Sequence, residues 1–218
     1  MFIGHYCAAF VAATHPKAPK LGTLFIAAQL VDFAFFLFVL AGIEQMRITP
    51  GITASNSLDL FHMPYTHSLI GTLVWAALFA LLLHRIFKNW TTAVIGGSVV
   101  ISHWVLDVLV HTADMSLAGG PPKFGLALWN YPAIEMPLEI ALVLGTAWLY
   151  ARATVPIMGK YRHSLTVLIA ALLAVQTWNW FGPQPTILTP ELPISALFAF
   201  FLFAALATWV SRSRAYRG

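Results

Sequence analysis

Cysteine and charged side chains are both scarce in this sequence of 218 residues. The single cysteine, Cys7, excludes an intrachain disulfide and a zinc site of the CxxC type. Any metal bound by this chain must therefore be held by His, Asp and Glu. Charged residues make up 9% of the chain against 59% hydrophobic residues, and the mean hydropathy is +0.78. These values lie outside the range of soluble globular domains and predict an integral membrane protein.

A cleavable secretory signal is also missing. The N-terminus has neither a basic segment nor an A-x-A pattern, and polar residues follow at Thr14 to Lys17, so we expect the N-terminus, with His5, to be retained. The net charge of +4 does not indicate nucleic-acid binding, because most basic residues lie in short connections between apolar segments.

Apolar runs predict an all-α fold, an integral membrane bundle of about six transmembrane helices. The first 13 residues are too short to cross a bilayer core of about 30 Å, so we expect a half-span or re-entrant helix there. The polar connection from Glu44 to Thr66 has no evident secondary structure. The expected spans are Leu21 to Ile43, His67 to Phe87, Thr91 to His111, Pro132 to Tyr150, Ser164 to Phe181 and Pro193 to Val210.

Lys and Arg residues alternate between connections in a way that predicts orientation. One set of connections holds only Arg47 and Lys123. The other set, which we expect to be cytoplasmic together with the C-terminus, holds Lys17, Lys20, Arg85, Lys88, Arg152, Lys160, Arg162, Arg212, Arg214 and Arg217.

Three ionisable residues recur at helical spacing in the third expected span: His103, Asp107 and His111. Residues four apart lie on one helix face, so imidazole, carboxylate and imidazole form one column. An ionisable group inside an apolar span costs on the order of 3 kcal/mol unless a partner or a function offsets it. The column therefore predicts a metal site, with a proton relay or a hydrogen-bonded buried polar set as the alternative.

The predicted topology places further ionisable residues at the same depth in the outer half of the membrane. They are His5, Asp32, His67 and Glu139, with His62 in the outer loop just above. So many N and O ligands exceed the needs of one tetrahedral zinc, and carboxylates can bridge, so we favour two ions. Such a site suits hydrolysis of a phosphoryl group. A Ser-His-Asp triad using Ser68 or Ser102 is the competing chemistry, although no G-x-S-x-G elbow is present.

The remaining polar residues receive simpler interpretations. Glu44, Asp59 and Glu191 are expected to be solvated loop charges, and Trp129 an anchor at the membrane interface. Glu135, one turn before Glu139, either faces water or joins the site. The last two spans have no ionisable residue in their interiors, and we expect them to be packing helices.

Several segments resemble those of a bacterial family of multi-span proteins, the membrane-bound metal-dependent hydrolases of the YdjM-like group. They are Gly4-His5, Asp32, His62-x-Pro64-Tyr65-Thr66-His67-Ser68, Ser102-His103-x-x-x-Asp107-x-x-x-His111, Gly125-Leu126-x-Leu128-Trp129-Asn130 and the stretch from Trp148 to Thr154. The resemblance covers about the first 155 residues. We therefore divide the chain into a metal-site domain, residues 1–155, and two added C-terminal helices, residues 156–218.

That group is in turn similar to zinc-dependent phospholipases C and single-strand nucleases, which are helical phosphodiesterases with a three-zinc site. The resemblance implies metal ligands at His5, Asp32, His67, His103, Asp107, His111 and Glu139, with Asp32 as a bridging or base-like carboxylate. Those enzymes have a His one turn before the last carboxylate, where this chain has Glu135, which favours two ions over three.

The leading hypothesis from the sequence is a hydrolase of the bacterial inner membrane. Its site is expected to face the periplasm and to hold one to three ions, with two favoured. Its predicted partners are membrane lipid and a lipid or lipid-linked phosphoester; no nucleic acid is expected, and the oligomeric state stays open. Asp32 and Asp107 are the expected catalytic residues, and zinc is the expected metal. The alternatives are a transporter or channel for a divalent metal or protons, and a structural site whose metal only ties the helices together.

Overall fold

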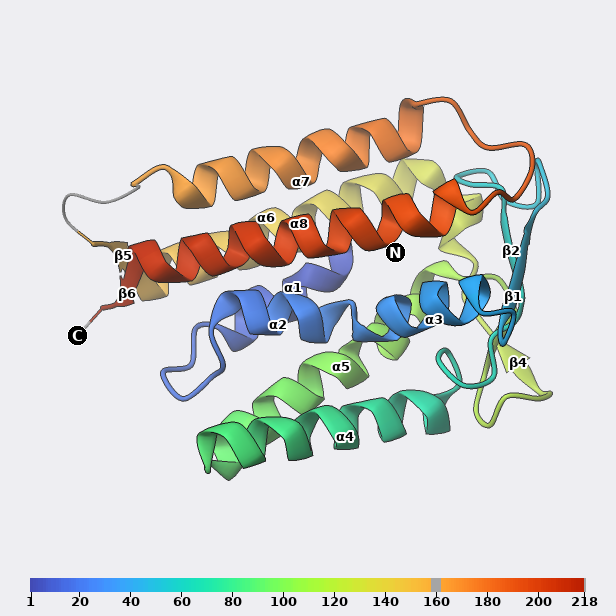
Figure 1. Cartoon of the computed structure of the whole chain (residues 1–218). Helices are drawn as coiled ribbons and strands as arrows, with labels where there is room; N and C mark the ends of the chain where they lie inside the picture. Colours follow the sequence, from blue (N-terminus) through green and yellow to red (C-terminus); the bar gives the residue numbers. More distant parts are fainter. Residues whose placement is uncertain (158–161, 218) are drawn as a thin grey trace.

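The computed structural model describes residues 1–157 and 162–217, so Lys160, one of the residues used to predict orientation, lies outside the described part. The described chain is a helical bundle with three two-stranded antiparallel sheets at its ends (Figure 1). The α-helices are α1 (Tyr6–Ala12, after a 3-10 turn at Ile3–His5), α2 (Leu21–Ala28), α3 (Leu30–Leu40), α4 (Leu69–Phe87), α5 (Trp90–Val110), α6 (Pro132–Ala153), α7 (Ser164–Phe181) and α8 (Glu191–Ser213). The strands are β1 (Gln45–Ile48), β2 (Leu58–His62), β3 (Met115–Ser116), β4 (Lys123–Phe124), β5 (Thr154–Pro156) and β6 (Arg214–Tyr216).

Five of the described helices, α4 to α8, are long and apolar enough to cross a membrane. A sixth span results if the bent pair α2 and α3 is counted as one. The predicted helical bundle is thus confirmed, and the N-terminal segment Ile3–Ala12 is a shorter apolar helix, as expected.

The expected continuous span from Leu21 to Ile43 is wrong in one respect, because it breaks at Gln29. Helices α2 and α3 meet there at an angle of 52°, and Gln29 has non-helical dihedrals of φ −110° and ψ 9°. Its buried side-chain amide donates to the Phe2 carbonyl at 3.1 Å. Neither Pro nor Gly marks the break, and its consequence is to place Asp32 in the first turn of α3.

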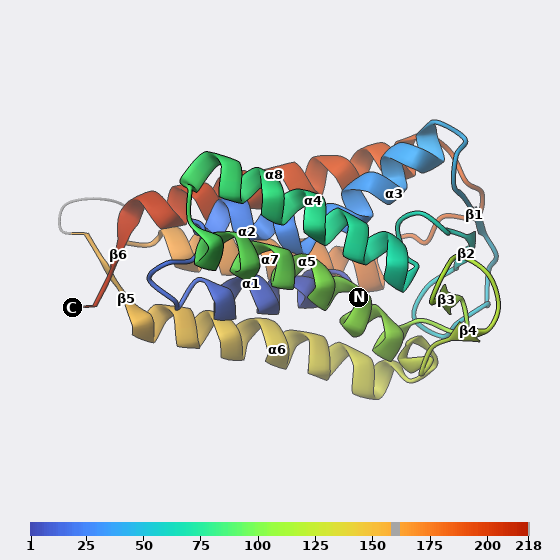
Figure 2. The same ribbon diagram turned by 90° about the horizontal axis from the view of Figure 1, so that it is seen from below.

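The connection from Glu44 to Thr66, expected to lack secondary structure, contains the β1–β2 hairpin. Arg47 pairs with Asp59 across the two strands, and their Nε and Oδ2 atoms lie 2.5 Å apart. A second small hairpin, β3–β4, follows α5 at the same end of the bundle (Figure 2). Together the hairpins close the end of the bundle at which the candidate site lies.

Helix α1 occupies the centre of the bundle, in contact with α2, α5 and α6 (Figure 2). Tyr6, Phe10 and Phe25 are fully buried there, and the rings of Tyr6 and Phe25 stack with centroids 4.2 Å apart. The N-terminal half-span is therefore packed inside protein, which allows it to place His5 deep in the bundle.

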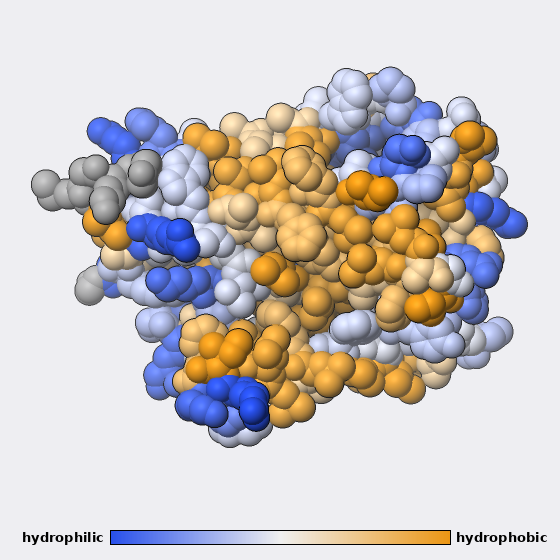
Figure 3. Space-filling view, viewed as in Figure 1, coloured by the Kyte–Doolittle hydropathy of each residue, from blue (hydrophilic) through white to orange (hydrophobic). Residues whose placement is uncertain are grey.

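Basic connections gather at one end of the molecule. The α1–α2 and α4–α5 connections and the β5–β6 sheet lie together on the left in Figure 1, opposite the β1–β2 hairpin. Hydrophilic groups flank a broad hydrophobic band between the two ends (Figure 3). This distribution matches the alternation of Lys and Arg residues along the sequence.

Gly22 permits the close approach of α2 to α8. A Cβ atom at this position would collide with the Thr208 side chain and lie 3.0 Å from the Ala204 carbonyl oxygen. We expect Gly22→Ala to lower the free energy of unfolding by about 1 to 3 kcal/mol, because backbone must shift to accept the methyl group. Thermal unfolding in detergent measures this loss.

Gly145→Ala is the matched control, since a Cβ on this helical glycine meets no described atom within 4 Å. We expect its midpoint temperature to equal or slightly exceed that of the wild type. Equal stability of the two variants would contradict the close packing of α2 on α8.

Candidate metal centre

Six of the ionisable residues singled out from the sequence converge on one place, although they come from distant parts of the chain. His5 ends the 3-10 turn before α1, His67 precedes α4, and His111 is the residue at which α5 ends. Asp32 lies in the first turn of α3, while His103 and Asp107 lie on α5. All are buried except Asp32, whose side chain is 17% exposed.

The Asp107 carboxylate lies at the centre of this cluster. Its Oδ1 atom is 3.1 Å from His5 Nε2 and 3.5 Å from His111 Nε2. Its Oδ2 atom is 3.0 Å from His103 Nε2 and 3.7 Å from His67 Nε2. The amino nitrogen of Met1 also lies 3.0 Å from Oδ1. The two carboxylate oxygens thus face two different sets of nitrogen atoms.

Asp32 supplies a second carboxylate beside the first. Its Oδ1 atom is 3.2 Å from His67 Nε2 and 3.5 Å from His103 Nε2. Two overlapping groups result, His5 with His103 and Asp107, and Asp32 with His67 and His103. Within each group the potential ligand atoms lie within 4.8 Å of one another. These buried His and Asp groups could hold a metal ion.

The imidazole rings are oriented as metal-binding histidines usually are. His67, His103 and His111 direct Nε2 toward the carboxylates, and their Nδ1 atoms have partners outside the cluster. His103 Nδ1 is 2.8 Å from the Ala28 carbonyl oxygen, and His111 Nδ1 is 2.9 Å from Asp114 Oδ1. A hydrogen bond at the second ring nitrogen fixes ring and tautomer, and leaves the first nitrogen free to bind metal.

Two histidines of the cluster have ring nitrogens that no hydrogen bond satisfies within the described chain. They are His5, at both nitrogens, and His103, at Nε2. Their rings stack with centroids 3.8 Å apart. Buried polar atoms without a partner are costly, and a metal ion bound beside the Asp107 carboxylate would satisfy these nitrogens.

Glu44 contributes to the site through Thr66, and its predicted role as a solvated charge is wrong. The Glu44 side chain is buried and accepts from the backbone N–H groups of Tyr65 and Thr66 at 2.8 and 3.0 Å. It also accepts from the Thr66 hydroxyl at 2.6 Å. Because that hydroxyl donates to Glu44, it can accept from His67 Nδ1, 2.9 Å away, which favours the tautomer whose Nε2 is free to bind a metal.

Three predicted ligands, Glu139, His62 and His111, fall outside the two groups found among the described residues, although His111 Nε2 lies 3.5 Å from Asp107 Oδ1. Glu139 Oε1 accepts the backbone N–H groups of Phe2 and Gly4 at 2.6 and 2.8 Å, and Oε2 accepts from Gln176 at 3.1 Å. Its carboxylate thereby fixes the segment that places His5. His62 lies exposed on strand β2, because the hairpin pairs it with Gln45 instead of folding it inward.

Trp129, which we expected to be an anchor at the membrane interface, is instead buried. The centroid of its ring lies 4.2 Å from that of His111, so together with Asp114 it holds this histidine in place.

The two serines proposed for a triad are bonded to backbone: the Ser68 hydroxyl donates to the Pro64 carbonyl, and the Ser102 hydroxyl to the Val99 carbonyl. Neither hydroxyl is hydrogen-bonded to a histidine within the described chain.

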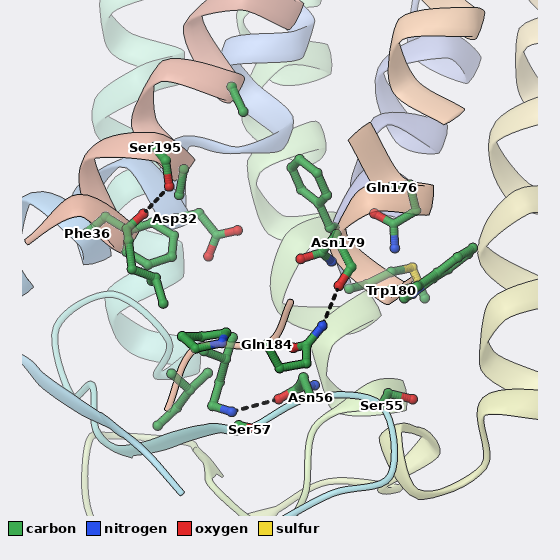
Figure 4. A pocket seen from close by; sticks show the side chains of 18 of the residues that line it. Asp32, Phe36, Ser55, Asn56, Ser57, Gln176, Asn179, Trp180, Gln184 and Ser195 are labelled. Atoms are coloured by element: carbon green, nitrogen blue, oxygen red, sulfur yellow. Dashed lines mark hydrogen bonds between the residues drawn. The ribbon is translucent and has the colours of Figure 1, made fainter. Parts of the chain in front are cut away.

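A cavity of about 650 Å³ lies against the cluster. Asp32, His67, Asp107 and His111 contribute to its lining, as does Glu135, whose side chain is buried with Oε2 lacking a hydrogen-bond partner among the described residues. Figure 4 shows Asp32 beside side chains from the β1–β2 connection and from α7 and α8. The last two helices therefore help to form the cavity, in addition to the packing role expected for them.

No family model, no curated protein and no solved structure matches this chain. The resemblance to the YdjM-like group stays a prediction from sequence motifs, and the geometry of the site is the basis for inferring function.

Replacement of His67 by Ala should remove bound metal, because His67 Nε2 faces both carboxylates. We expect the metal content of the purified protein to fall by at least about tenfold, as measured by elemental analysis. His62→Ala is the matched control and should retain the wild-type content, since His62 lies exposed on β2. Equal loss in both variants would contradict the ligand set.

Glu44→Gln should weaken metal binding without removing a ligand. An amide nitrogen facing Thr66 would turn the hydroxyl so that it donates to His67 Nδ1, which moves the ring proton to Nε2. We expect the dissociation constant for metal, from competition with a chelating dye, to rise about 10- to 100-fold. Asp59→Asn, which removes a carboxylate paired with Arg47 outside the cavity lining, should leave it unchanged. An unchanged constant for Glu44→Gln would show that Thr66 does not set the tautomer.

Proposed function

We propose that this protein is a membrane-embedded, metal-dependent hydrolase acting on a phosphoester. The observation that carries the proposal is the convergence of four imidazoles on two carboxylates beside a cavity of about 650 Å³. The cavity is also lined by exposed residues such as Trp178 and Gln184, so it reaches the protein surface. A site buried on one side and accessible on the other is suited to a reaction on a bound substrate.

Two zinc-like ions fit the donor set best. Imidazole and carboxylate ligands without thiolate suit zinc, and Asp107 can bridge because its two oxygens face different nitrogens. The residues that would hold the ions are His5, His103 and Asp107 in one group and Asp32, His67 and His103 in the other. When bound, the ions polarise the phosphoryl oxygens and acidify the attacking water.

The residues of the chain then have separable roles. Asp32 is the cluster carboxylate with an exposed edge, so it is placed to accept a proton from the water. In the overall reaction, the water oxygen bonds to phosphorus, one P–O ester bond breaks, and the departing alcohol oxygen takes up a proton. Asp107 holds the ligands together, since every histidine of the cluster contacts it.

A lipid or lipid-linked substrate near the outer leaflet is supported by the placement of the site. The cluster lies where α4 begins and α5 ends. In Figure 1 these helix ends are on the side of the hairpins, and the Lys- and Arg-rich connections are at the other end of the bundle. Cytoplasmic connections are enriched in Lys and Arg, so we place the site on the periplasmic or outer side. A bacterial inner membrane, as the resemblance implies, is the proposed location.

A transporter or channel is less consistent with the packing below the cluster. An ion path toward the basic end would have to pass the region of α1, where Tyr6, Phe10 and Phe25 are fully buried against one another. Polar groups that could replace the water around an ion are needed along such a path. We therefore keep transport only as an outcome of the functional test.

The zinc-loaded protein in detergent should hydrolyse a chromogenic phosphodiester and short-chain phospholipids. We expect a chelator to abolish the activity and Asp107→Asn to reduce kcat/KM at least about 1000-fold, because the carboxylate that all four histidines contact is lost. Asp59→Asn is the control, since Asp59 pairs with Arg47 on the hairpin. Absence of turnover together with zinc flux into proteoliposomes would replace the hydrolase with a transporter.

A further inference from the structure

The wall of the cavity away from the metal-ligand groups has a composition that hydrolysis alone does not require. Hydroxyl and amide side chains from three parts of the chain gather there (Figure 4). The connection between β1 and β2, the end of α7 with its following loop, and the first turns of α8 contribute Ser55, Asn56, Ser57, Asn179, Gln184 and Ser195. These residues are uncharged at all physiological pH values, so they select by hydrogen bonding.

Charge in the cavity is entirely acidic apart from its histidines and the amino group of Met1. No Lys or Arg lines it within residues 1–157 and 162–217, whereas Glu135 and Glu191 do. A substrate with a second anionic group would therefore find no cationic side chain and would face carboxylates. The Glu135 Oε2 atom, buried and without a partner, is an acceptor suited to a hydroxyl group.

Aromatic and apolar groups complete the cavity. Trp178 and Trp180 lie at the end of α7, and indole rings pack against the C–H faces of sugars while amides bind their hydroxyls. Phe36 of α3 and Phe200 of α8 form an apolar part of the lining, with ring centroids 6.0 Å apart. One cavity thus combines a phosphoryl site, a neutral polar region and an apolar wall.

We propose that the neutral polar region binds an uncharged, hydroxyl-rich headgroup of sugar or polyol type, joined by one phosphodiester to a lipid chain that lies against α3 and α8. This inference rests on the hydrolase function proposed above. Part of this hydrogen-bonding capacity is used within the chain, since Gln184, Asn56 and Ser195 bond to backbone groups, whereas the buried Ser55 hydroxyl has no partner among the described residues. A quaternary ammonium headgroup has no hydrogen-bond donor or acceptor, so it would gain nothing from the positions that are free.

Binding and cleavage of matched lipids test the proposal with the full chain in nanodiscs. Four short-chain phosphodiesters share the same acyl chains and bear inositol, glycerol, choline or serine headgroups. Tryptophan fluorescence reports binding to the metal-free protein, and phosphate-ester products report cleavage by the zinc-loaded protein. We expect the inositol lipid to bind at least about tenfold more tightly than the choline and serine lipids, equivalent to one or two hydrogen bonds.

Asn179→Leu should weaken binding of the inositol lipid about fivefold and leave binding of the choline lipid unchanged. Asn130→Leu is the matched control, because Asn130 is exposed and outside the cavity lining. Equal binding of all four headgroups, or tighter binding of choline, would overturn the proposal even if every lipid is cleaved. Selective binding without any cleavage would support the headgroup site and contradict the proposed hydrolase function.

Discussion

The burial of Asp107 is the constraint on which the rest of the structure depends. Removing a carboxylate from water costs on the order of several kcal/mol unless opposite charge or hydrogen bonds surround it. Here four imidazoles from three segments and the amino group of Met1 meet that need. Each of these segments must reach the same point, so the positions of α1, α4 and the end of α5 are coupled through one side chain.

The N-terminal segment shows how this constraint is met. It is too short to span a bilayer, yet it packs centrally because Glu139 accepts the N–H groups of Phe2 and Gly4 and Gln29 donates to the Phe2 carbonyl. Gln29, which makes the contact with Phe2, is also the residue at which the α2–α3 span breaks. Gln176 on α7 completes the arrangement by donating to Glu139, which links the last helices to the site.

Local sequence signals predicted the helices well and the polar contacts poorly. Apolar runs with short polar breaks located α4 to α8 to within a few residues, and the four-residue spacing on α5 put His103 above Asp107. Glu44 and His62 were misjudged because both lie in one polar connection, where the sequence does not show which backbone N–H groups will be buried. Pairing in the hairpin leaves His62 exposed, and the backbone N–H groups of Tyr65 and Thr66 donate to the Glu44 carboxylate.

The sequence by itself determined the membrane class, the ligand types available and the depth of each ionisable group along its helix, because hydropathy and helical rise depend on chain composition and position. Only the tertiary structure decided which groups face one another, since rotation of a helix about its axis is set by packing against its neighbours. It therefore decided that Asp107 is central, that Glu139 holds backbone, and that α7 and α8 share in the cavity. Apolar runs in the sequence cannot predict that α7 and α8 line the cavity. Asn179 and Gln184 become lining residues only because the β1–β2 connection folds opposite them.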